Sequence, residues 1–579
     1  MKRKRGSKSI GRPGHVASRM ARGQADLRPR RTGSVLLLVV VVVAMLTLAA
    51  FNFAQNMTTE FEAASMYTMD IQARATADSG VEFVATVLGN KGSVTAENLI
   101  HNPQLFMGQV VSASPHLRAN SRFTIIAPVE HDATNNAIRY GLMDESAKLN
   151  LNYLPNMGLS PDDISTMLMN IPNMTAEIID AIIDWMDTDD TVSPYGAESE
   201  TYQQMQPPYK AKNGPFETID ELLLVKGITP TLLYGEDANR NGLLDPNEND
   251  GDASPPLDNA DGVLNHGFIA YFSVHGRESN RRLDGKPKIN VNNGYLTDLY
   301  DQLIEAFDEN TAKFIIGYRI NGPSGKQAVS LTNPVPTPSA NTSLSGATAT
   351  APLSIVNQEA AEGLTSFLSY VTNSGGAVTR GGIDLSKGGP TSIESLWQLI
   401  GTSTRITVNG AAQTITSPWP AETSSVTTSL PDMLDKLTVT ADTYLEGRIN
   451  INQARREILI GLPTMTEEIV NAITNAQHLD ANGQPSLDTI SQHTTTAWLF
   501  AEGLVDLPGM INLDPYITAH GDIYRVQVLG FFDGGGPVSR IEAMVDSTQL
   551  PPRVILQRDL NELGRGYSRS QLLPMLPSR

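Results

Sequence analysis

Apolar residues are most concentrated in one long run near the amino terminus. Residues 34–54 contain no charged side chain. As a helix they would be about 31 Å long, which matches the hydrocarbon core of a bilayer. The run passes without Gly or Pro into residues 57–88, whose composition is compatible with a helix. The pattern predicts one transmembrane helix that continues beyond the membrane, over residues 34–92.

A second pattern is an internal repeat. The order cation, apolar, Asn, apolar, Asn occurs three times, at residues 148–152, 288–292 and 448–452. Alternation of this kind predicts a short strand with one buried face, and the last Asn is placed to cap the helix that follows. We refer to these three segments as the Asn phrases.

Each Asn phrase is followed by apolar residues at helical spacing, which predicts a pair of helices. In the first and third copies, a Thr with an acid two or three residues later is expected to begin the second helix. The predicted pairs are 162–168 with 176–186, 299–307 with 312–320, and 454–460 with 467–475. Acidic helix starts further on, at 217–222, 391–396 and weakly at 486–490, complete three related helical modules.

Strand signals lie outside these modules. Residues 523–529 and 538–545 alternate on either side of a Gly-rich turn, which predicts a hairpin. Together with 123–126 and 137–142, they are expected to form an antiparallel sheet against the lower half of the amino-terminal helix. The fold class predicted is α+β, with a long transmembrane helix, a sheet and inserted helical modules.

Charge sets the orientation of the apolar helix. Residues 1–32 hold eleven cations and one acid, so by the positive-inside rule this leader stays cytoplasmic and the chain beyond residue 54 is exported. The whole chain has a net charge of −19, and a surface so acidic should repel nucleic acid. A cleaved secretory signal, cut near Ala49-Ala50, is the alternative to a retained helix.

A twelve-residue segment, residues 237–248, has the spacing of a calcium loop. Oxygen-bearing side chains occupy positions 1, 3, 5, 9 and 12, a Gly stands at position 6, and position 7 supplies a backbone carbonyl. The predicted ligands are Asp237, Asn239, Asn241, Leu243, Asp245 and Glu248. An acidic surface turn is the alternative. Because the chain has no cysteine, a hard cation is one of the few ways left to hold a long loop.

A second acidic group is ambiguous between a metal site and a solvated surface. The group begins in the last turn of the second helix of the first module and continues beyond it; its members are Asp184, Asp187, Asp189 and Glu198. Catalysis is not predicted, because no nucleophile, metallohydrolase or phosphate-loop motif is present and the nine His are scattered.

Several motifs together resemble a known family. Gly33 precedes the apolar run, as it does at the cleavage site of type IV pilins and pseudopilins. Leu38 stands where most of that class carry Glu, and Ile183-Asp184-Trp185-Met186-Asp187 is followed by Pro207-Pro208-Tyr209. An unpaired carboxylate in lipid is costly, so a subunit with no neighbour above it has reason to lack that Glu. The combination resembles the minor pseudopilin K family of type II secretion, over the amino-terminal helix, 137–234 and 443–475.

This resemblance implies a non-enzymatic subunit at the tip of a periplasmic pseudopilus. It implies cleavage by a prepilin peptidase between Gly33 and Ser34, anchoring in the inner membrane, and packing with other minor pseudopilins. Contact with secreted substrates or with the outer-membrane channel is also expected. A minor type IV pilin stays open as an alternative, and so does a membrane-anchored helix-hairpin-helix protein of DNA uptake, since paired helices with a Pro-containing hairpin occur there too.

The resemblance and the patterns together suggest a division of the chain. The sheet would be pilin-like, and the inserted modules would be helix-hairpin-helix-like, that is, SAM-like. The expected segments are a leader (1–33), the long helix (34–92), the first part of the sheet domain (93–152), a module with the calcium loop (153–265), a second module with an uncharged insertion at 327–358 (266–440), a third module (441–510) and the carboxy-terminal strands and tail (511–579).

Overall fold

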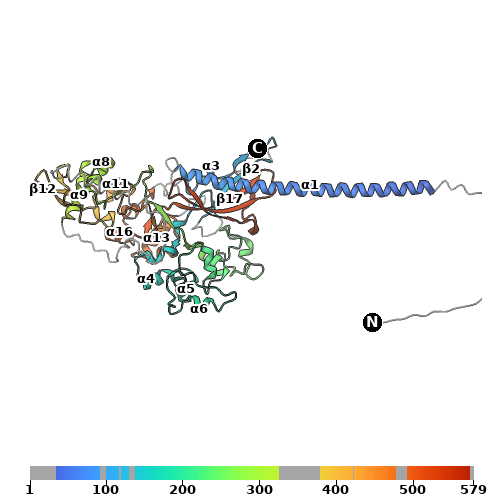
Figure 1. Ribbon diagram of the computed structural model, residues 1–579, viewed down its shortest axis with the longest axis horizontal. Helices are drawn as coiled ribbons and strands as arrows, with labels where there is room; N and C mark the ends of the chain where they lie inside the picture. Colours follow the sequence, from blue (N-terminus) through green and yellow to red (C-terminus); the bar gives the residue numbers. More distant parts are fainter. Residues whose placement is uncertain are drawn as a thin grey trace, which may run out of the picture. The chain divides into compact units, whose positions relative to one another are not determined.

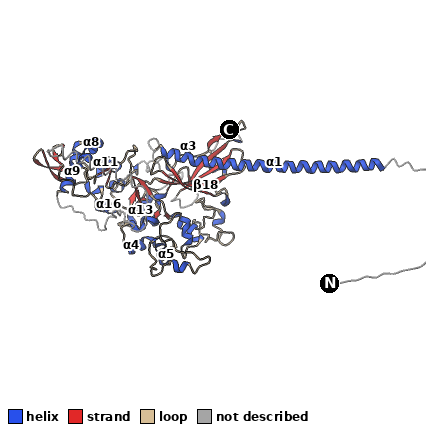
Figure 2. Cartoon of the chain, viewed as in Figure 1, coloured by secondary structure: helices blue, strands red, loops and turns tan. Residues whose placement is uncertain are grey.

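The computed structural model describes residues 34–90, 99–116, 119–129, 137–324, 378–421, 423–477 and 492–573. The leader 1–33, the insertion 327–358 and the helix start at 486–490 therefore lie outside the described residues. Within them the protein is a mixture of helices and an antiparallel sheet, as predicted (Figure 2). The chain divides into two compact units, Met1–Tyr67 and Thr68–Arg579.

The amino-terminal helix α1 covers Ser34–Gly89 and ends three residues before the predicted limit. It is the one described helix that is long and apolar enough to cross a membrane, with a mean hydropathy of 2.8 over its most apolar window. Side chains from Val35 to Tyr67 are exposed. An apolar surface of this length is unfavourable in water, so the first unit is suited to lipid or to a protein partner.

In the second unit, the last turns of α1 pack on a sheet of seven strands, and Figure 1 shows β2 and β17 beside this part of the helix. The sheet order is β1-β2-β17-β18-β19, with β3 paired to β2 and β4 to β17. The strands are β1 (Gln109–Ser112), β2 (Ser121–Pro128), β3 (Ile138–Arg139), β4 (Met143–Asp144), β17 (Ile523–Phe532), β18 (Ser539–Asp546) and β19 (Arg553–Asp559). The predicted sheet is confirmed, and β4 and the edge strands β1 and β19 are additional.

Close approach between helix and sheet depends on two glycines. A Cβ on Gly530 of β17 would lie 2.1 Å from the carbonyl oxygen of Ala73, and one on Gly80 of α1 would lie 2.5 Å from Val528 Cγ1. Either side chain would force the helix away from the sheet. With the helix seated, Ala77, Val81 and Val84 join the apolar core of the sheet.

The three helix pairs are present close to their predicted positions. They are α4 (Pro161–Leu168) with α5 (Ala176–Met186), α8 (Leu296–Ala306) with α9 (Glu309–Asn321), and α12 (Arg456–Leu459) with α13 (Glu467–Ala476). Thr175 and Thr466 cap α5 and α13, each accepting from the N–H three residues on at 3.3 Å. Asn173 and Thr464 occupy equivalent hairpin positions, both with φ of 63°. The repeat therefore extends to backbone conformation.

Each Asn phrase forms a two-residue strand that pairs in parallel with a strand further along the chain. β5 (Leu149–Asn150) pairs with β6 (Phe272–Ser273), β8 (Ile289–Asn290) with β13 (Leu437–Thr438), and β15 (Ile449–Asn450) with β16 (Ile517–Thr518). The sequence pattern predicts the first strand of each pair but not its partner. The parallel pairing joins the start of each module to its end.

The last Asn of the phrase does not cap a helix, and the prediction is wrong in this detail. Asn152 Nδ2 donates to the carbonyls of Phe216 and Val274, and Asn292 Nδ2 donates to those of Ile393 and Val439. Asn452 does the same toward His493 and Ala519. The first Asn instead accepts from the N–H two residues on, as at Asn150 and Asn152. The side-chain amide of the last Asn thus connects the interior of each module to the end of its closing strand, which is the strand that pairs with the Asn phrase (β6, β13 or β16).

The remaining elements fill the modules. The first contains η2 (Glu145–Ala147), η3 (Leu151–Asn156), α6 (Ser199–Tyr202), η4 (Ile219–Leu224), α7 (Pro230–Tyr234), η5 (Pro246–Glu248) and η6 (Phe268–Ala270); β7 (Arg277–Ser279) follows and pairs with β14 (Tyr444–Glu446). The second contains β9 (Thr379–Arg380), β10 (Ile383–Asp384), η7 (Leu396–Leu399), β11 (Ser403–Val408), β12 (Ala411–Thr416) and α11 (Thr423–Lys436). The third contains α15 (Ala497–Ala501) and α16 (Leu507–Leu513), and α3 (Pro103–Phe106), η8 (Asn561–Leu563) and α17 (Arg569–Leu572) accompany the sheet.

Candidate metal centres

Three carboxylates of the first module converge in space. Asp184 lies in the last turn of α5, Asp187 is its C-cap, and Glu198 is the N-cap of α6. One carboxylate oxygen from each residue lies within 4.8 Å of the others. We call this group the acidic triad. Hard carboxylate oxygens at this separation are the ligand type that calcium prefers.

Glu198 is the most unusual member of the acidic triad. It is 2% exposed, and neither of its carboxylate oxygens has a hydrogen-bond partner among the described residues. Burial, followed by the charges of Asp187 and Asp184, raises the pKa of Glu198 to about 7. Burial also raises the pKa of Asp187. A buried carboxylate without a partner is costly, and a bound cation would offset that cost.

The loop between α5 and α6 brings these residues together. Asp184 is buried and accepts from the N–H of Ser193 at 3.1 Å, which folds the loop back over the helix end. A Cβ on Gly196 would lie 2.0 Å from Asp184 Oδ2, so that position has room only for Gly. Asp189 does not join the triad; it is exposed, and it accepts from the N–H of Thr191. The roles of Gly196 and Ser193 were not predicted from the sequence, because they are visible only in the folded loop.

The predicted calcium loop, residues 237–248, forms a compact turn. Gly242 has a φ of 73°, the left-handed conformation that a Gly at position 6 allows. Asp237 accepts from the N–H groups of Asn241 and Gly242 at 3.0 and 2.8 Å. Glu248 accepts from the N–H groups of Ala238 and Asp245 at 3.0 and 3.1 Å. These hydrogen bonds hold the carboxylates of the first and last loop residues against the backbone inside the loop.

The predicted ligands of this loop differ from the acidic triad in the spacing of their carboxylates and in their hydrogen bonds. The carboxylate oxygens of Asp237, Asp245 and Glu248 do not meet the 4.8 Å separation that the acidic triad meets. Each of these carboxylates also accepts hydrogen bonds from the loop itself. Those to Asp245 come from the side chains of Asn239 and Asn241. Burial raises the pKa of Asp237, and burial and neighbouring acids raise that of Glu248 to about 7. The donor set suits calcium, but a cation would compete with these bonds.

The loop also contacts the sheet. Arg540 of β18 donates to the carbonyls of Asn239 and Arg240, and Gln527 of β17 donates to that of Arg240 at 2.7 Å. Asn241 Nδ2 donates to the Gly566 carbonyl near the carboxy terminus. A change in the loop's conformation would therefore be transmitted to the sheet.

The predicted cleavage position is described in part. Gly33 lies outside the described residues, and Ser34 begins α1. Leu38, the residue at the position where the class usually has Glu, is 63% exposed on the helix.

Comparisons with known proteins concern the same region. Residues 147–234 match the family described as type II secretion system (T2SS), protein K. A curated relative, "Type II secretion system protein K" of Klebsiella pneumoniae, is 24% identical over 214 residues, which are 35% of this chain and 60% of that protein. The chain thus aligns with less than two thirds of that relative. The acidic triad lies inside the matched residues, and the loop 237–248 lies just beyond them.

A solved structure was also found. The match covers 86% of this chain and 99% of the solved chain, with a TM-score of 0.31 and 10% identity. That structure is titled as the GspK-GspI-GspJ complex of the type 2 secretion system from enterotoxigenic Escherichia coli.

Proposed function

We propose that the chain is a member of the type II secretion system protein K family, to which it is similar at residues 147–234, and that it caps the tip of a periplasmic pseudopilus and supports its assembly for protein export. The observation that carries the proposal is the family match at residues 147–234 in a chain that also begins its described part with the apolar helix α1. Either feature alone is compatible with more kinds of protein than the two together.

Anchoring and processing follow from α1. We propose that a prepilin peptidase cuts between Gly33 and Ser34, and that the helix then spans the inner membrane with the second unit in the periplasm. The exposed apolar side chains from Val35 to Tyr67 support a lipid or helix–helix environment. Leu38 supports a terminal position, since a Glu there would pair with the amino terminus of a neighbouring subunit above.

The partners we propose are other minor pseudopilins, packed through the exposed part of α1. Contacts between the second unit and secreted substrates or the outer-membrane channel are a further part of the proposal. A role in DNA uptake is not favoured, because the net charge of −19 repels polyanions. No catalytic activity is proposed.

Calcium is proposed at two places in the first module. The acidic triad would bind it through Asp184, Asp187 and Glu198, and the loop would bind it through Asp237, Asn239, Asn241, Leu243, Asp245 and Glu248. The partnerless oxygens of Glu198 support the first site, and the spacing of the loop supports the second. The expected effect of the cation is stability rather than catalysis.

Export provides the test of function. In a strain that lacks this gene, the proteins normally secreted should accumulate in the periplasm, and a plasmid copy of the full chain should restore their release. A plasmid copy with Gly33→Leu should fail to restore it, because the peptidase would not cut, and mass spectrometry of the amino terminus would show the uncut leader. Normal secretion in the deletion strain would contradict the proposal.

A further inference from the structure

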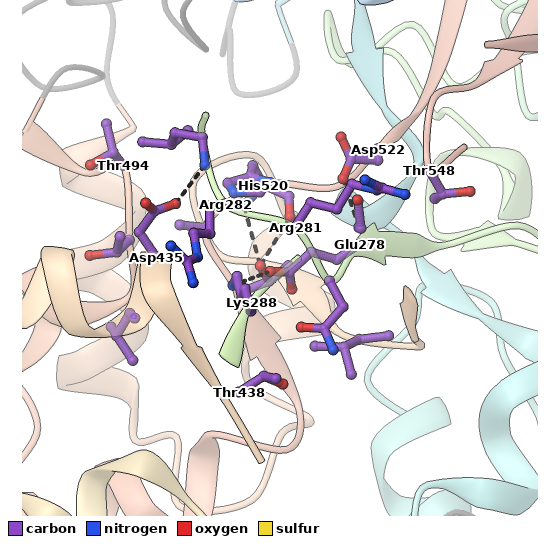
Figure 3. Close-up of a pocket in the computed structure, with 18 of the residues that line it drawn as sticks. Glu278, Arg281, Arg282, Lys288, Asp435, Thr438, Thr494, His520, Asp522 and Thr548 are labelled. Carbon is purple, nitrogen blue, oxygen red and sulfur yellow. Dashed lines mark hydrogen bonds and ion pairs between the residues drawn. The ribbon is translucent and has the colours of Figure 1, made fainter. Parts of the chain in front are cut away.

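A cavity of about 590 Å³ lies in the second unit, and its described lining mixes six acidic with four Lys or Arg side chains. Lys288 lies 3.8 Å from Glu278 (Figure 3), and Arg448 lies 3.9 Å from the same carboxylate. Opposite charges there offset one another, so the cavity favours no class of ligand. A more specific arrangement lies on the sheet, beside the candidate calcium loop.

The sheet has α1 on one face and two other segments on the opposite face. Val528 of β17 packs with α1, whereas its neighbour Leu529 belongs to a separate apolar cluster, because successive side chains of a strand point to opposite faces. That cluster takes Leu243 from the candidate calcium loop and Tyr567 from residues 561–573, which we call the tail segment. The loop and the tail segment therefore lie side by side on the face that α1 leaves open.

Asn241 joins the loop to the tail segment. It stands at position 5 of the loop and is 0% exposed. Its Nδ2 donates to the Gly566 carbonyl at 2.6 Å, and its own carbonyl accepts from the Tyr567 hydroxyl at 2.9 Å. The same hydroxyl lies 3.0 Å from Gln527 Oε1 of β17. One predicted cation ligand is thus bonded to two consecutive residues of the tail segment.

The tail segment passes very close to the loop and to β18. Gly566 has a φ of 71°, which favours Gly, and a Cβ there would lie 2.6 Å from Arg540 Nη1 and 3.3 Å from Asn241 Cβ. Arg540 in turn donates to the carbonyls of Asn239 and Arg240. Loop, tail segment and sheet are therefore packed around one buried guanidinium.

The end of the tail segment is attached to the sheet separately. The Thr124 hydroxyl of β2 donates to the Leu572 carbonyl at 2.7 Å, and the Tyr140 hydroxyl donates to the Gln571 carbonyl at 2.8 Å. The contacts with the loop therefore hold the middle of the tail segment, between β19 and this attached end.

We infer that the tail segment is part of the cation site of the loop, and that a cation bound in the loop holds the tail segment on the sheet. This inference rests on the calcium site proposed above for residues 237–248. Position 5 of such a loop binds the cation through a side-chain oxygen. Asn241 Oδ1 accepts from the Leu243 N–H at 2.7 Å and has a second lone pair for the cation. The nitrogen of the same amide stays directed at Gly566.

Two effects would couple the cation to the tail segment. A cation on Asn241 Oδ1 orients and polarises the amide, so that Nδ2 becomes a stronger donor to the Gly566 carbonyl. The cation also offsets the mutual repulsion of Asp237, Asp245 and Glu248, which otherwise favours opening of the loop. Each opening would break the bonds between the loop and the tail segment.

One substitution separates the two roles of Asn241. Asp is as suitable a ligand as Asn at position 5 of a calcium loop. A carboxylate, however, has no N–H for the Gly566 carbonyl, and one of its oxygens would replace the nitrogen that now lies 2.6 Å from that carbonyl. Asn241→Asp should therefore keep the cation and release the tail segment.

Hydrogen–deuterium exchange with mass spectrometry follows the loop and the tail segment separately in the full chain in lipid nanodiscs. Every sample carries Asp184→Asn with Glu198→Gln, so that calcium does not act through the acidic triad; the unmodified triad is used if this parent unfolds in a thermal scan. Relative to chelator, calcium should slow exchange in both segments. With calcium, Asn241→Asp should keep the loop slow, while its tail segment exchanges about two- to tenfold faster than in the parent, as expected for one lost hydrogen bond.

Asn247→Asp is the matched control, because it adds the same charge at an exposed loop position and should leave exchange in the tail segment unchanged. Tyr567→Phe removes the bond to the Asn241 carbonyl but keeps the ring. It should also speed exchange in the tail segment, and it replaces Asn241→Asp if that variant no longer folds or binds calcium.

The outcomes distinguish the coupling from the calcium site itself. If calcium slows exchange in the loop but not in the tail segment, or if the tail segment of Asn241→Asp exchanges as in the parent, the coupling is refuted while the loop remains a calcium site. If calcium slows exchange in neither segment, the proposed loop site is wrong and the coupling is refuted with it.

Discussion

The acidic triad and the loop 237–248 are two carboxylate groups in one module, and they differ in how the fold treats their oxygens. The loop has the stronger sequence spacing, yet its carboxylates accept hydrogen bonds from its own backbone and side chains. The triad has no recognisable spacing, yet it leaves both oxygens of Glu198 without a partner. Ligand spacing along the chain and readiness to bind a cation are therefore separate properties.

The difference has a physical origin. Residues 237–248 are close in sequence, so backbone N–H groups are always near the side-chain oxygens and satisfy them locally. The triad joins the end of α5 to the start of α6 across a loop. Asp184 and Asp187 accept from loop N–H groups, but Glu198 lies buried beside these like charges without a donor. We expect the triad to gain more from calcium than the loop does.

The largest expected effect is the loss of calcium-dependent stability in the acidic triad. One calcium site stabilises the folded state by roughly 2.7 kcal/mol when calcium is present at about a hundred times its Kd. The double variant Asp184→Asn with Glu198→Gln should lose this gain in the free energy of unfolding. Thermal unfolding of the full chain in nanodiscs, with calcium and with a chelator, measures the difference. Asp189→Asn is the matched control and should keep the wild-type shift. A full shift in the double variant would place the main site elsewhere.

A smaller effect is expected from the loop, and it should appear even without calcium. Asp237→Ala with Glu248→Ala removes the acceptors of four backbone N–H groups, which should destabilise the chelated protein by about 1–3 kcal/mol and reduce the calcium shift only in part. Denaturant unfolding in chelator measures the first change. Asn247→Ala, at an exposed loop position, should leave stability within about 0.5 kcal/mol. If the double variant abolishes the whole calcium shift while the triad variant keeps it, the order of the two sites is reversed.

A further expected effect is a dependence on pH in the absence of calcium. The pKa of Glu198 is about 7 in the folded protein and 4.5 as its ordinary value, so the folded state holds a proton that the unfolded state has lost between these values. Stability should therefore fall as the pH rises from about 4.5 to 7. Glu198→Gln should flatten this slope, and calcium should oppose it by binding the deprotonated form. If the pH dependence of stability is unchanged in Glu198→Gln, another titrating group causes it. Glu248 would be the first group to test.

Elements with local signals were predictable. Helices α5 and α13 begin after Thr175 and Thr466 as expected, because capping and apolar periodicity act within a few residues. The four strands β2, β3, β17 and β18 were also expected. The closing strands β6, β13 and β16 were not, because a two-residue strand carries almost no periodicity and its partner is 68 to 148 positions away.

The sequence by itself determined the long apolar helix and the threefold repeat, and it predicted the ligands of the loop, since each depends on spacing between residues that are neighbours in the chain. Only the tertiary structure decided which oxygens remain without a partner. In the tertiary structure, the last Asn of each phrase donates to two carbonyls instead of capping a helix. Glu198 lies close to Asp184, and Lys288 and Arg448 lie near the same carboxylate, that of Glu278. These outcomes depend on contacts between distant segments, where packing rather than local preference selects the partner.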